Sequence, residues 1–90
     1  SIAGANERGF YNSNPMLVET ERAMMRCAEQ VMIVADSTKF GHASLARLCD
    51  WQDVHALVVD DAVEATWVEL ARASGIEVHL AAAPPKESTP

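Results

Sequence analysis

The stretch that most constrains the fold runs from Val31 to Gly41 and reads Val-Met-Ile-Val-Ala-Asp-Ser-Thr-Lys-Phe-Gly. Its five leading apolar residues, without alternation, are typical of a strand buried on both faces, as parallel strands are in α/β proteins. The polar residues that follow would lie past the carboxyl end of that strand, where open α/β sheets bind ligands. Lys39 supplies a positive charge, and Ser37 and Thr38 supply hydrogen-bond donors. The sequence therefore predicts a site for a small anion such as a phosphate.

Composition places the chain among globular proteins of one domain. Its 90 residues are 49% hydrophobic and 22% charged, which is typical of a folded domain. No apolar run approaches the roughly 20 residues that span a membrane, and the first residues do not resemble a signal peptide. The formal net charge of -6 repels phosphate backbones, so direct nucleic-acid contact is disfavoured. The chain begins with Ser1 rather than methionine, so we expect a piece of a longer protein.

Cysteine and histidine usage indicates neither a disulfide scaffold nor a metal site. Cys27 and Cys49 are too few for a scaffold, and Cys27 falls on the apolar side of a predicted helix, where a reduced thiol behaves as a small hydrophobe. Reduced cysteines fit a cytoplasmic location. The histidines are His42, His55 and His79, and their spacing matches no zinc pattern, so no metal is expected.

The rest of the chain alternates predicted helices and strands. Residues 1–15 are rich in Gly and Asn, which favour a loop, with a short strand at 1–5 as an alternative. A helix is predicted for 16–30, with Asn14 as its cap and Pro15 in its first turn. The later elements expected are a short helix at 42–48, a polar turn at 50–53, a strand at 55–60, a helix at 62–74 ending at Gly75, and a strand at 76–80.

This order predicts an α/β fold, a parallel sheet flanked by helices in a Rossmann-like arrangement with right-handed crossovers. Residues 1–81 would form the domain, and residues 82–90 a flexible C-terminal tail. Three strands are few for such a sheet. We therefore expect the rest of a parent protein, or a second copy of the chain, to cover its exposed edge.

One carboxylate lies in an unexpected place on the helix predicted at 16–30. The apolar side of that helix consists of Leu17, Val18, Ala23, Met24, Met25, Cys27 and Ala28. Glu21 falls inside this arc, where a carboxylate is costly unless it is paired or used. In a structural interpretation Glu21 lies at the helix edge and either extends its carboxylate to solvent or pairs with a nearby arginine. In a functional one it faces the same pocket as Lys39 and hydrogen-bonds sugar hydroxyls or acts as a base.

The polar residues after the strands also have structural interpretations. Asp36 would cap the turn that follows while Lys39 points into solvent, and Asp60 or Asp61 would cap the next helix. Asn12 would be an ordinary turn residue. The position of the Asp-Ser-Thr-Lys loop at the end of a strand favours a ligand site. The chain carries no dinucleotide fingerprint, P-loop or Gly-x-Ser-x-Gly elbow, so no cofactor and no catalytic residues are predicted.

Several segments carry a resemblance to a known family. They are Gly9-Phe-Tyr-Asn-Ser-Asn, Glu19-Thr-Glu-Arg-Ala-Met-Met, the run from Val31 to Gly41, His55-Ala-Leu-Val-Val-Asp-Asp and Gly75-Ile-Glu-Val-His-Leu. Their order and spacing resemble the effector-sensing domain of DeoR-family bacterial transcriptional repressors, whose signature is a helix, an apolar strand and an Asp-Ser-Ser-Lys-Phe-Gly-like loop. The resemblance covers residues 1 to about 81 and implies the second half of that domain.

That sensing domain is similar to ribose-5-phosphate isomerase and related sugar-phosphate folds. In the isomerase a loop lysine lies near the substrate phosphate and a helix glutamate serves as base, and by position these correspond to Lys39 and Glu21. The glycine-rich phosphate loop and the winged helix-turn-helix of the repressors would lie upstream of Ser1. The resemblance therefore implies half a pocket and no DNA-reading element in this chain.

The leading hypothesis is a sensor of a phosphorylated sugar or sugar acid, without enzyme activity or cofactor. The ligand-binding residues would be Lys39, Ser37 and Thr38 for the phosphate or carboxylate, and Glu21, Asp36 and Asn12 for the hydroxyls. Binding would control DNA only through the missing N-terminal domain, within a homo-oligomer. The alternatives are a sugar-phosphate isomerase-like enzyme fragment and a structural α/β module without a ligand.

Overall fold

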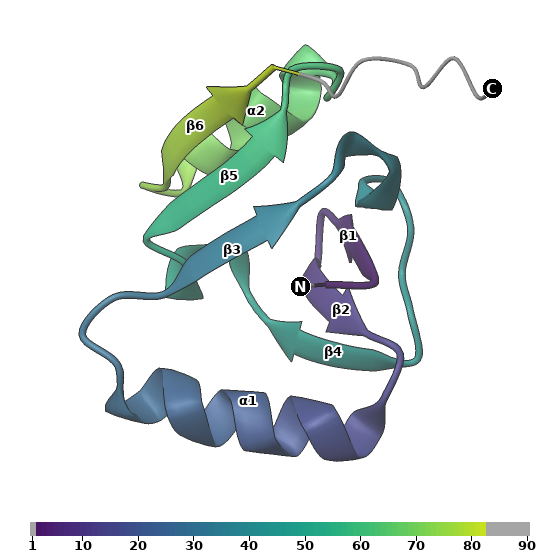
Figure 1. Cartoon of the computed structure of the whole chain (residues 1–90), viewed down its shortest axis with the longest axis vertical. Coiled ribbons are helices and arrows are strands. Elements are labelled where there is room, and N and C mark those ends of the chain that lie inside the picture. The colour runs from purple at the N-terminus through teal and green to yellow at the C-terminus, as the bar shows by residue number, and fades with distance from the viewer. Residues whose placement is uncertain (1, 83–90) are drawn as a thin grey trace, which may run out of the picture.

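Two three-stranded sheets organise the molecule (Figure 1). The computed structural model describes residues 2–82. The parallel sheet has the order β3-β5-β6, and its strands are β3 (Met32–Ala35), β5 (Ala56–Asp60) and β6 (Glu77–Ala81). The antiparallel sheet has the order β1-β2-β4, and its strands are β1 (Gly4–Asn6), β2 (Gly9–Asn12) and β4 (Ala46–Cys49). The predicted α/β class and its parallel strands are confirmed, whereas the antiparallel sheet departs from the prediction of a single parallel layer.

Each sheet carries one helix. α1 (Pro15–Cys27) packs on β2 and β4, and α2 (Ala65–Ala73) packs on β6. Figure 1 shows the two helices at opposite ends of the view. Two short 3-10 turns follow strands, η1 (Ser37–Lys39) after β3 and η2 (Trp51–Asp53) after β4. The polar loop singled out in the sequence is therefore a helical turn at the carboxyl end of a parallel strand.

The prediction for residues 1–15 is right in part: β1 overlaps the short strand expected at 1–5, but β2 lies where a loop was expected, and the two strands form a hairpin. Asn6 pairs with Gly9, and the Asn6 side chain accepts a hydrogen bond from the backbone N–H of Arg8 at 2.9 Å. Gly9 has φ +137, and a Cβ at this position would collide with the carbonyl oxygen of Cys49 on β4. The glycine and asparagine are thus turn residues, as expected, but they serve a tight hairpin that lies directly against β4.

The short helix predicted at 42–48 is also wrong. The second half of this segment is β4, which pairs antiparallel with β2 through Tyr11 and Arg47. Leu48 and Cys49 are both buried in the core. Pairing with a strand about 35 residues earlier in the chain overrides the local helix preference, as tertiary contacts often do.

The start of α1 follows the prediction, and its packing does not. The Asn14 side chain accepts hydrogen bonds from two backbone N–H groups of the first turn, at 3.0 and 3.3 Å, with Pro15 in that turn. The helix ends at Cys27 rather than at residue 30. Only Val18 of its apolar arc is buried, while Met24 is 66% exposed. Met25 packs partly buried against the core and Leu17 is 45% exposed, so within residues 2–82 that side of the helix is covered only in part.

β3 was expected to be buried on both faces, and this prediction is wrong. Ile33 is 6% exposed, but Met32 and Val34 are 62% and 56% exposed. These two side chains share one face of the parallel sheet because successive residues of a strand point to opposite faces. Among the described residues, β3 is an edge strand bonded only to β5, and the face that carries Met32 and Val34 remains open.

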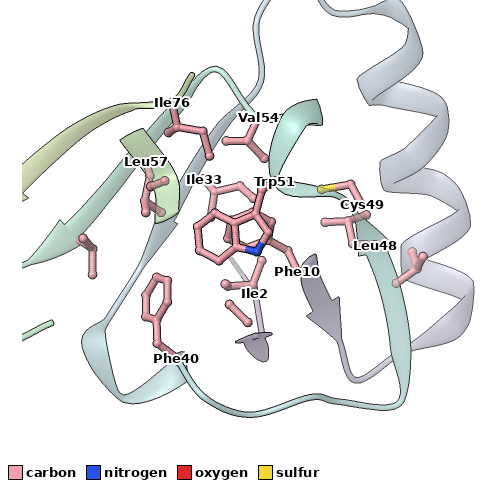
Figure 2. Packing of buried hydrophobic residues seen from close by; sticks show 14 residues of the cluster. Ile2, Phe10, Ile33, Phe40, Leu48, Cys49, Trp51, Val54, Leu57 and Ile76 are labelled. Atoms are coloured by element: carbon pink, nitrogen blue, oxygen red, sulfur yellow. The ribbon is translucent and has the colours of Figure 1, made fainter. Parts of the chain in front are cut away.

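The core lies between the two sheets and is rich in aromatic rings (Figure 2). Trp51 is 3% exposed and contacts Phe10, with ring centroids 4.5 Å apart. Its ring stacks on Trp67 at 6.2 Å, and its indole N–H donates to the Asn6 carbonyl at 2.7 Å. Trp51 is therefore at the centre of the core, although it lies in the segment predicted as a polar turn. The other buried residues labelled in Figure 2 are Ile2, Ile33, Phe40, Leu48, Cys49, Val54, Leu57 and Ile76.

The remaining elements follow the sequence closely. β5 and β6 lie within one residue of their predicted ends. α2 ends before Gly75, which has φ +84, but it begins at Ala65, three residues later than predicted. The predicted tail begins at residue 82, and residues 83–90 lie outside the described part of the chain. Within residues 2–82, no helix has the length and apolar character required to cross a bilayer.

Candidate functional site

The predicted anion loop is held in shape by its own aspartate. Asp36 is the N-cap of η1, and its side chain accepts hydrogen bonds from the backbone N–H of Thr38 at 2.9 Å and from the Thr38 hydroxyl. The capping interpretation of Asp36 is thus confirmed. Both polar hydrogens of Thr38 are directed at Asp36, so they are not free to meet a ligand while the loop keeps this shape.

A second aspartate fastens the loop to the neighbouring strand. Asp60, the last residue of β5, accepts from the backbone N–H of Ser37 at 2.5 Å and from the backbone N–H of Ala62 at 3.3 Å. Hydrogen bonds from the Ser37 hydroxyl and from its backbone N–H lower the pKa of Asp60. The sequence predicted that Asp60 or Asp61 caps the next helix, with a ligand role as the less favoured alternative. The capping prediction is wrong, because α2 begins at Ala65 with Glu64 as its N-cap. The contact of Asp60 with Ser37 follows from the parallel pairing, because β3 and β5 end at the same edge.

Lys39 carries the one charge of this loop that these hydrogen bonds do not involve. It closes η1 and is half-buried, and its ammonium makes no hydrogen bond or ion pair with any residue between 2 and 82. The two carboxylates of the loop region, Asp36 and Asp60, are engaged by Ser37 and Thr38. An unpaired cation therefore lies beside a loop whose other polar groups are already bonded.

Asn12 and Glu21, both candidate site residues, are brought together by the fold. The Asn12 amide nitrogen donates to Glu21 Oε1 at 2.8 Å, and Asn12 is only 7% exposed. The Asn12 amide oxygen accepts from the backbone N–H of Ser13 at 2.9 Å. Glu21 is half-buried. The structural interpretation that pairs Glu21 with an arginine is wrong, because its partner is this buried amide.

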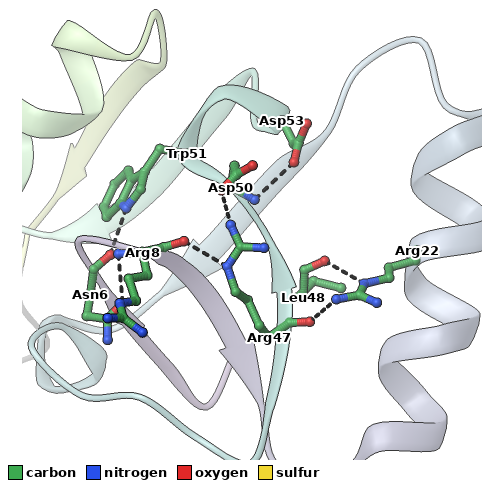
Figure 3. A network of polar contacts seen from close by, with 8 residues as sticks. All are labelled: Asn6, Arg8, Arg22, Arg47, Leu48, Asp50, Trp51 and Asp53. Atoms are coloured by element: carbon green, nitrogen blue, oxygen red, sulfur yellow. Dashed lines mark hydrogen bonds and ion pairs between the residues drawn. The ribbon is translucent and has the colours of Figure 1, made fainter.

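The arginine next to Glu21 binds the backbone instead. Arg22 Nε donates to the carbonyl of Leu48 at 3.0 Å, and its terminal nitrogen donates to the carbonyl of Arg47 (Figure 3). Consecutive residues of α1 therefore reach two strands, Glu21 reaching β2 and Arg22 reaching β4. These polar bonds add to the packing of Val18 and Met25 in joining α1 to the antiparallel sheet. Sequence reasoning missed this role of Arg22.

A pocket of about 220 Å³ lies between α1 and the open face of β3. Its walls are Ile2, Glu21, Met24, Met25, Val31, Met32, Ile33, Val34 and Leu48. Glu21 is the only charged residue in this apolar wall, whereas Lys39 does not line it. The lining ends at Val34, two residues before Asp36 opens the η1 loop. Within residues 2–82, the pair Asn12 and Glu21 and the η1 loop with Lys39 thus lie near the same strand, β3, but they do not share a pocket.

No group of three or more His, Cys, Asp and Glu side chains within residues 2–82 is arranged to hold a metal ion. Cys49 is buried, and its pKa is raised to about 12 by desolvation and by the charge of Asp53. Such a thiol is neither a metal ligand nor a nucleophile at neutral pH. Within residues 2–82 the candidate residues thus comprise the unpaired ammonium of Lys39 and the Glu21 carboxylate, which is hydrogen-bonded to Asn12 and lines an apolar pocket.

Comparison with known proteins identifies relatives of this chain. Residues 1–61 match the family model described as the DeoR C terminal sensor domain. A protein of Escherichia coli O157:H7, named "Putative aga operon transcriptional repressor", is 35% identical over 74 residues. The match covers 82% of this chain and 28% of that protein, so the chain spans little more than a quarter of its relative.

Proposed function

Because the chain belongs to the family of DeoR C-terminal sensor domains, we propose that it binds a phosphorylated sugar or sugar acid as the effector of a transcriptional repressor. The observation that carries this proposal is the free ammonium of Lys39 at the carboxyl end of β3. Ligands of open α/β sheets bind at this edge. An anionic group that meets an unpaired cation there forms charge-assisted hydrogen bonds, which are about twice as strong as neutral ones.

In this proposal the members of the loop have unequal roles. Lys39 contacts the phosphate or carboxylate directly. Asp36, Ser37 and Thr38 hold the loop that presents it, because their hydrogen bonds run to one another and to Asp60. Ser37 and Thr38 reach the anion themselves only if they exchange these internal bonds for bonds to the ligand. A preformed loop lowers the entropic cost of binding.

Asn12 and Glu21 supply the polar end of the apolar pocket. The Glu21 carboxylate accepts one hydrogen bond from Asn12, and a carboxylate has further lone pairs for sugar hydroxyls. The lining stops two residues short of the loop, at Val34. We propose that an effector lies along the open face of β3, with hydroxyls toward Glu21 and its anionic group toward Lys39.

Binding would be passed on through α1. The effector competes for Glu21, one of the two side chains that tie α1 to the antiparallel sheet. A ligand shifts such an equilibrium by its differential affinity for the two positions of the helix. We propose that this shift reaches DNA through an N-terminal domain of a longer, cytoplasmic, homo-oligomeric repressor. The parallel sheet would then be part of a larger Rossmann-like, sugar-phosphate-isomerase-like layer.

The isomerase alternative requires Glu21 to act as a base beside an acid partner. Within residues 2–82 the side chain that Glu21 contacts is the amide of Asn12, which cannot supply or take the second proton. We therefore favour binding without turnover. A coupled isomerase assay on the longer protein that detects turnover above the buffer rate would contradict this choice.

The proposed function is tested by titrating the repressor with a panel of sugar phosphates in a calorimeter. Lys39→Ala should weaken the binding of the active sugar phosphate at least tenfold, because a hydrogen bond to a charged group contributes about 1.5–3 kcal/mol. Arg72→Ala, which removes an equal charge from the exposed last turn of α2, is the matched control and should bind normally. Unchanged affinity in Lys39→Ala rules out the assigned role.

A further inference from the structure

A hollow of about 420 Å³ lies at the opposite end of the parallel strands from Lys39. It opens between the second half of α1, η2 and the residues that precede β3 and β5. Its walls are Arg22, Met25, Arg26, Ala28, Val31, Arg47, Leu48, Cys49, Asp53 and His55. Its volume is that of a metabolite site, for which about 300–1,000 Å³ is usual. We call it the basic hollow.

Positive charge is concentrated in the basic hollow. The whole chain has 7 lysines and arginines against 13 acids, yet three of the seven line this one cavity. Arg47 is neutralised by an ion pair with Asp50. Arg22 and Arg26 remain, opposed by Asp53 alone, whose carboxylate accepts from the backbone N–H of Asp50 at 2.9 Å. The lining therefore keeps a positive surplus in a chain of formal net charge -6.

The two arginines of α1 differ in their hydrogen bonding. Arg22 is bonded to the carbonyls of β4 (Figure 3), whereas Arg26 makes no hydrogen bond or ion pair with any residue from 2 to 82. The two lie four residues apart on the helix, where like charges face and repel each other. An anion between them would relieve this repulsion and occupy the free guanidinium.

His55 adds a ring N–H donor, and a hydrogen bond to its other ring nitrogen fixes which nitrogen carries the proton. Its Nδ1 accepts the backbone N–H of Val31 at 2.9 Å, so Nδ1 carries no proton. The proton of the neutral ring is therefore on Nε2, which is left as a hydrogen-bond donor. The wall of the basic hollow thus combines two guanidinium groups and an imidazole N–H from separate elements.

We propose that the basic hollow is a second anion site, which binds a small free molecule through a phosphate or carboxylate group. Arg26 is the principal contact, and Arg22 and His55 complete the donor set. The basic hollow shares Met25, Val31 and Leu48 with the apolar pocket, but its donor groups differ from those of the effector site, since neither Lys39 nor Glu21 lines it. Its affinity falls with salt, because exposed charges are screened over about 8 Å at physiological ionic strength.

Titration of the ¹⁵N-labelled protein with inorganic phosphate at constant ionic strength tests this site. The backbone amide of Val31 and the Nε–H of Arg26 should shift along one saturable curve. Arg26→Gln should weaken phosphate binding at least about tenfold. Arg72→Gln, which removes an equal charge elsewhere, should leave it unchanged. Shifts that grow linearly with phosphate, or an equal affinity in Arg26→Gln, overturn the proposal.

A gain-of-affinity variant covers the case in which Arg26→Gln perturbs the fold. Asp53→Asn removes the opposing charge while its amide oxygen still accepts from the backbone of Asp50, so phosphate should bind several-fold more tightly. An unchanged or weaker affinity contradicts the electrostatic argument. Phosphate shifts at Lys39 without shifts at the Nε–H of Arg26 would indicate the effector site alone, and would overturn the second site while leaving the proposed function intact.

Discussion

Removal of the Glu21 carboxylate should destabilise the protein measurably. In Glu21→Ala the amide nitrogen of Asn12, a residue only 7% exposed, loses its acceptor at 2.8 Å. A buried donor left without a partner costs about 1–3 kcal/mol. Relief from the desolvation of the half-buried carboxylate offsets part of this cost, so we expect a loss of about 1–2 kcal/mol. Glu21→Gln keeps the acceptor oxygen and should lose less than about 1 kcal/mol.

Urea unfolding followed by tryptophan fluorescence is a suitable assay, because Trp51 and Trp67 stack in the core. In a thermal melt, each kcal/mol lost from the free energy of unfolding should lower the Tm by roughly 4–8 °C in a domain of this size. Glu19→Ala, an exposed glutamate of the same helix, is the control and should change stability by less than about 0.5 kcal/mol. In a double-mutant cycle, Asn12→Ala and Glu21→Ala should couple by at least about 0.5 kcal/mol.

Two results would refute this reasoning. If Glu21→Ala is as stable as Glu19→Ala, the hydrogen bond to Asn12 contributes nothing net. If Glu21→Ala is more stable than the parent protein, the carboxylate is a strained functional group whose removal relieves the fold. The second result would strengthen the binding role of Glu21 while contradicting its role in fixing α1.

Three further predictions concern single positions. Cys27 should react with a thiol reagent at about pH 8 in the folded protein while Cys49 does not, because burial raises the pKa of the Cys49 thiol to about 12; reaction of both thiols without denaturant would contradict this. Hydrogen bonds from Ser37 lower the pKa of Asp60 below its ordinary 3.8, so its carboxylate contributes stability above that pH, which is lost as the pH falls through the folded-state pKa. Asp60→Asn should therefore flatten the acid side of the stability profile, and an unchanged profile would refute the contact. Gly9→Ala should cost about 1–3 kcal/mol or more in urea unfolding, because φ is +137 and the added Cβ meets the Cys49 carbonyl; a neutral effect would show that β2 can move away from β4.

Local signals were enough to predict the elements that local chemistry decides. Asn14 and Pro15 begin α1, and Gly75 follows the end of α2, because a cap and a positive φ are properties of a few adjacent residues. The hairpin of β1 and β2 and the strand β4 were missed, because their pairing joins residues far apart in the chain. The open face of β3 was missed for a related reason, since an apolar run does not tell what covers it.

The candidate site shows the same division. The loop after β3 was predicted from its composition, and the cap by Asp36 was among the interpretations. The bond from Asp60 to Ser37 needs the knowledge that β5 is the parallel neighbour of β3. The bond between Asn12 and Glu21 joins a strand end to a helix and has no sequence signature at a spacing of nine residues. Pairing of polar groups across elements is thus where the sequence alone falls short.

The most direct test of the central claim compares a phosphorylated sugar with the same sugar lacking its phosphate, in the parent repressor and in Lys39→Ala. If the ammonium beside η1 holds the anionic group, the parent protein should prefer the phosphorylated form at least tenfold and the variant should lose that preference. A preference of equal size in both proteins would contradict the account, because the phosphate would then be bound by other residues.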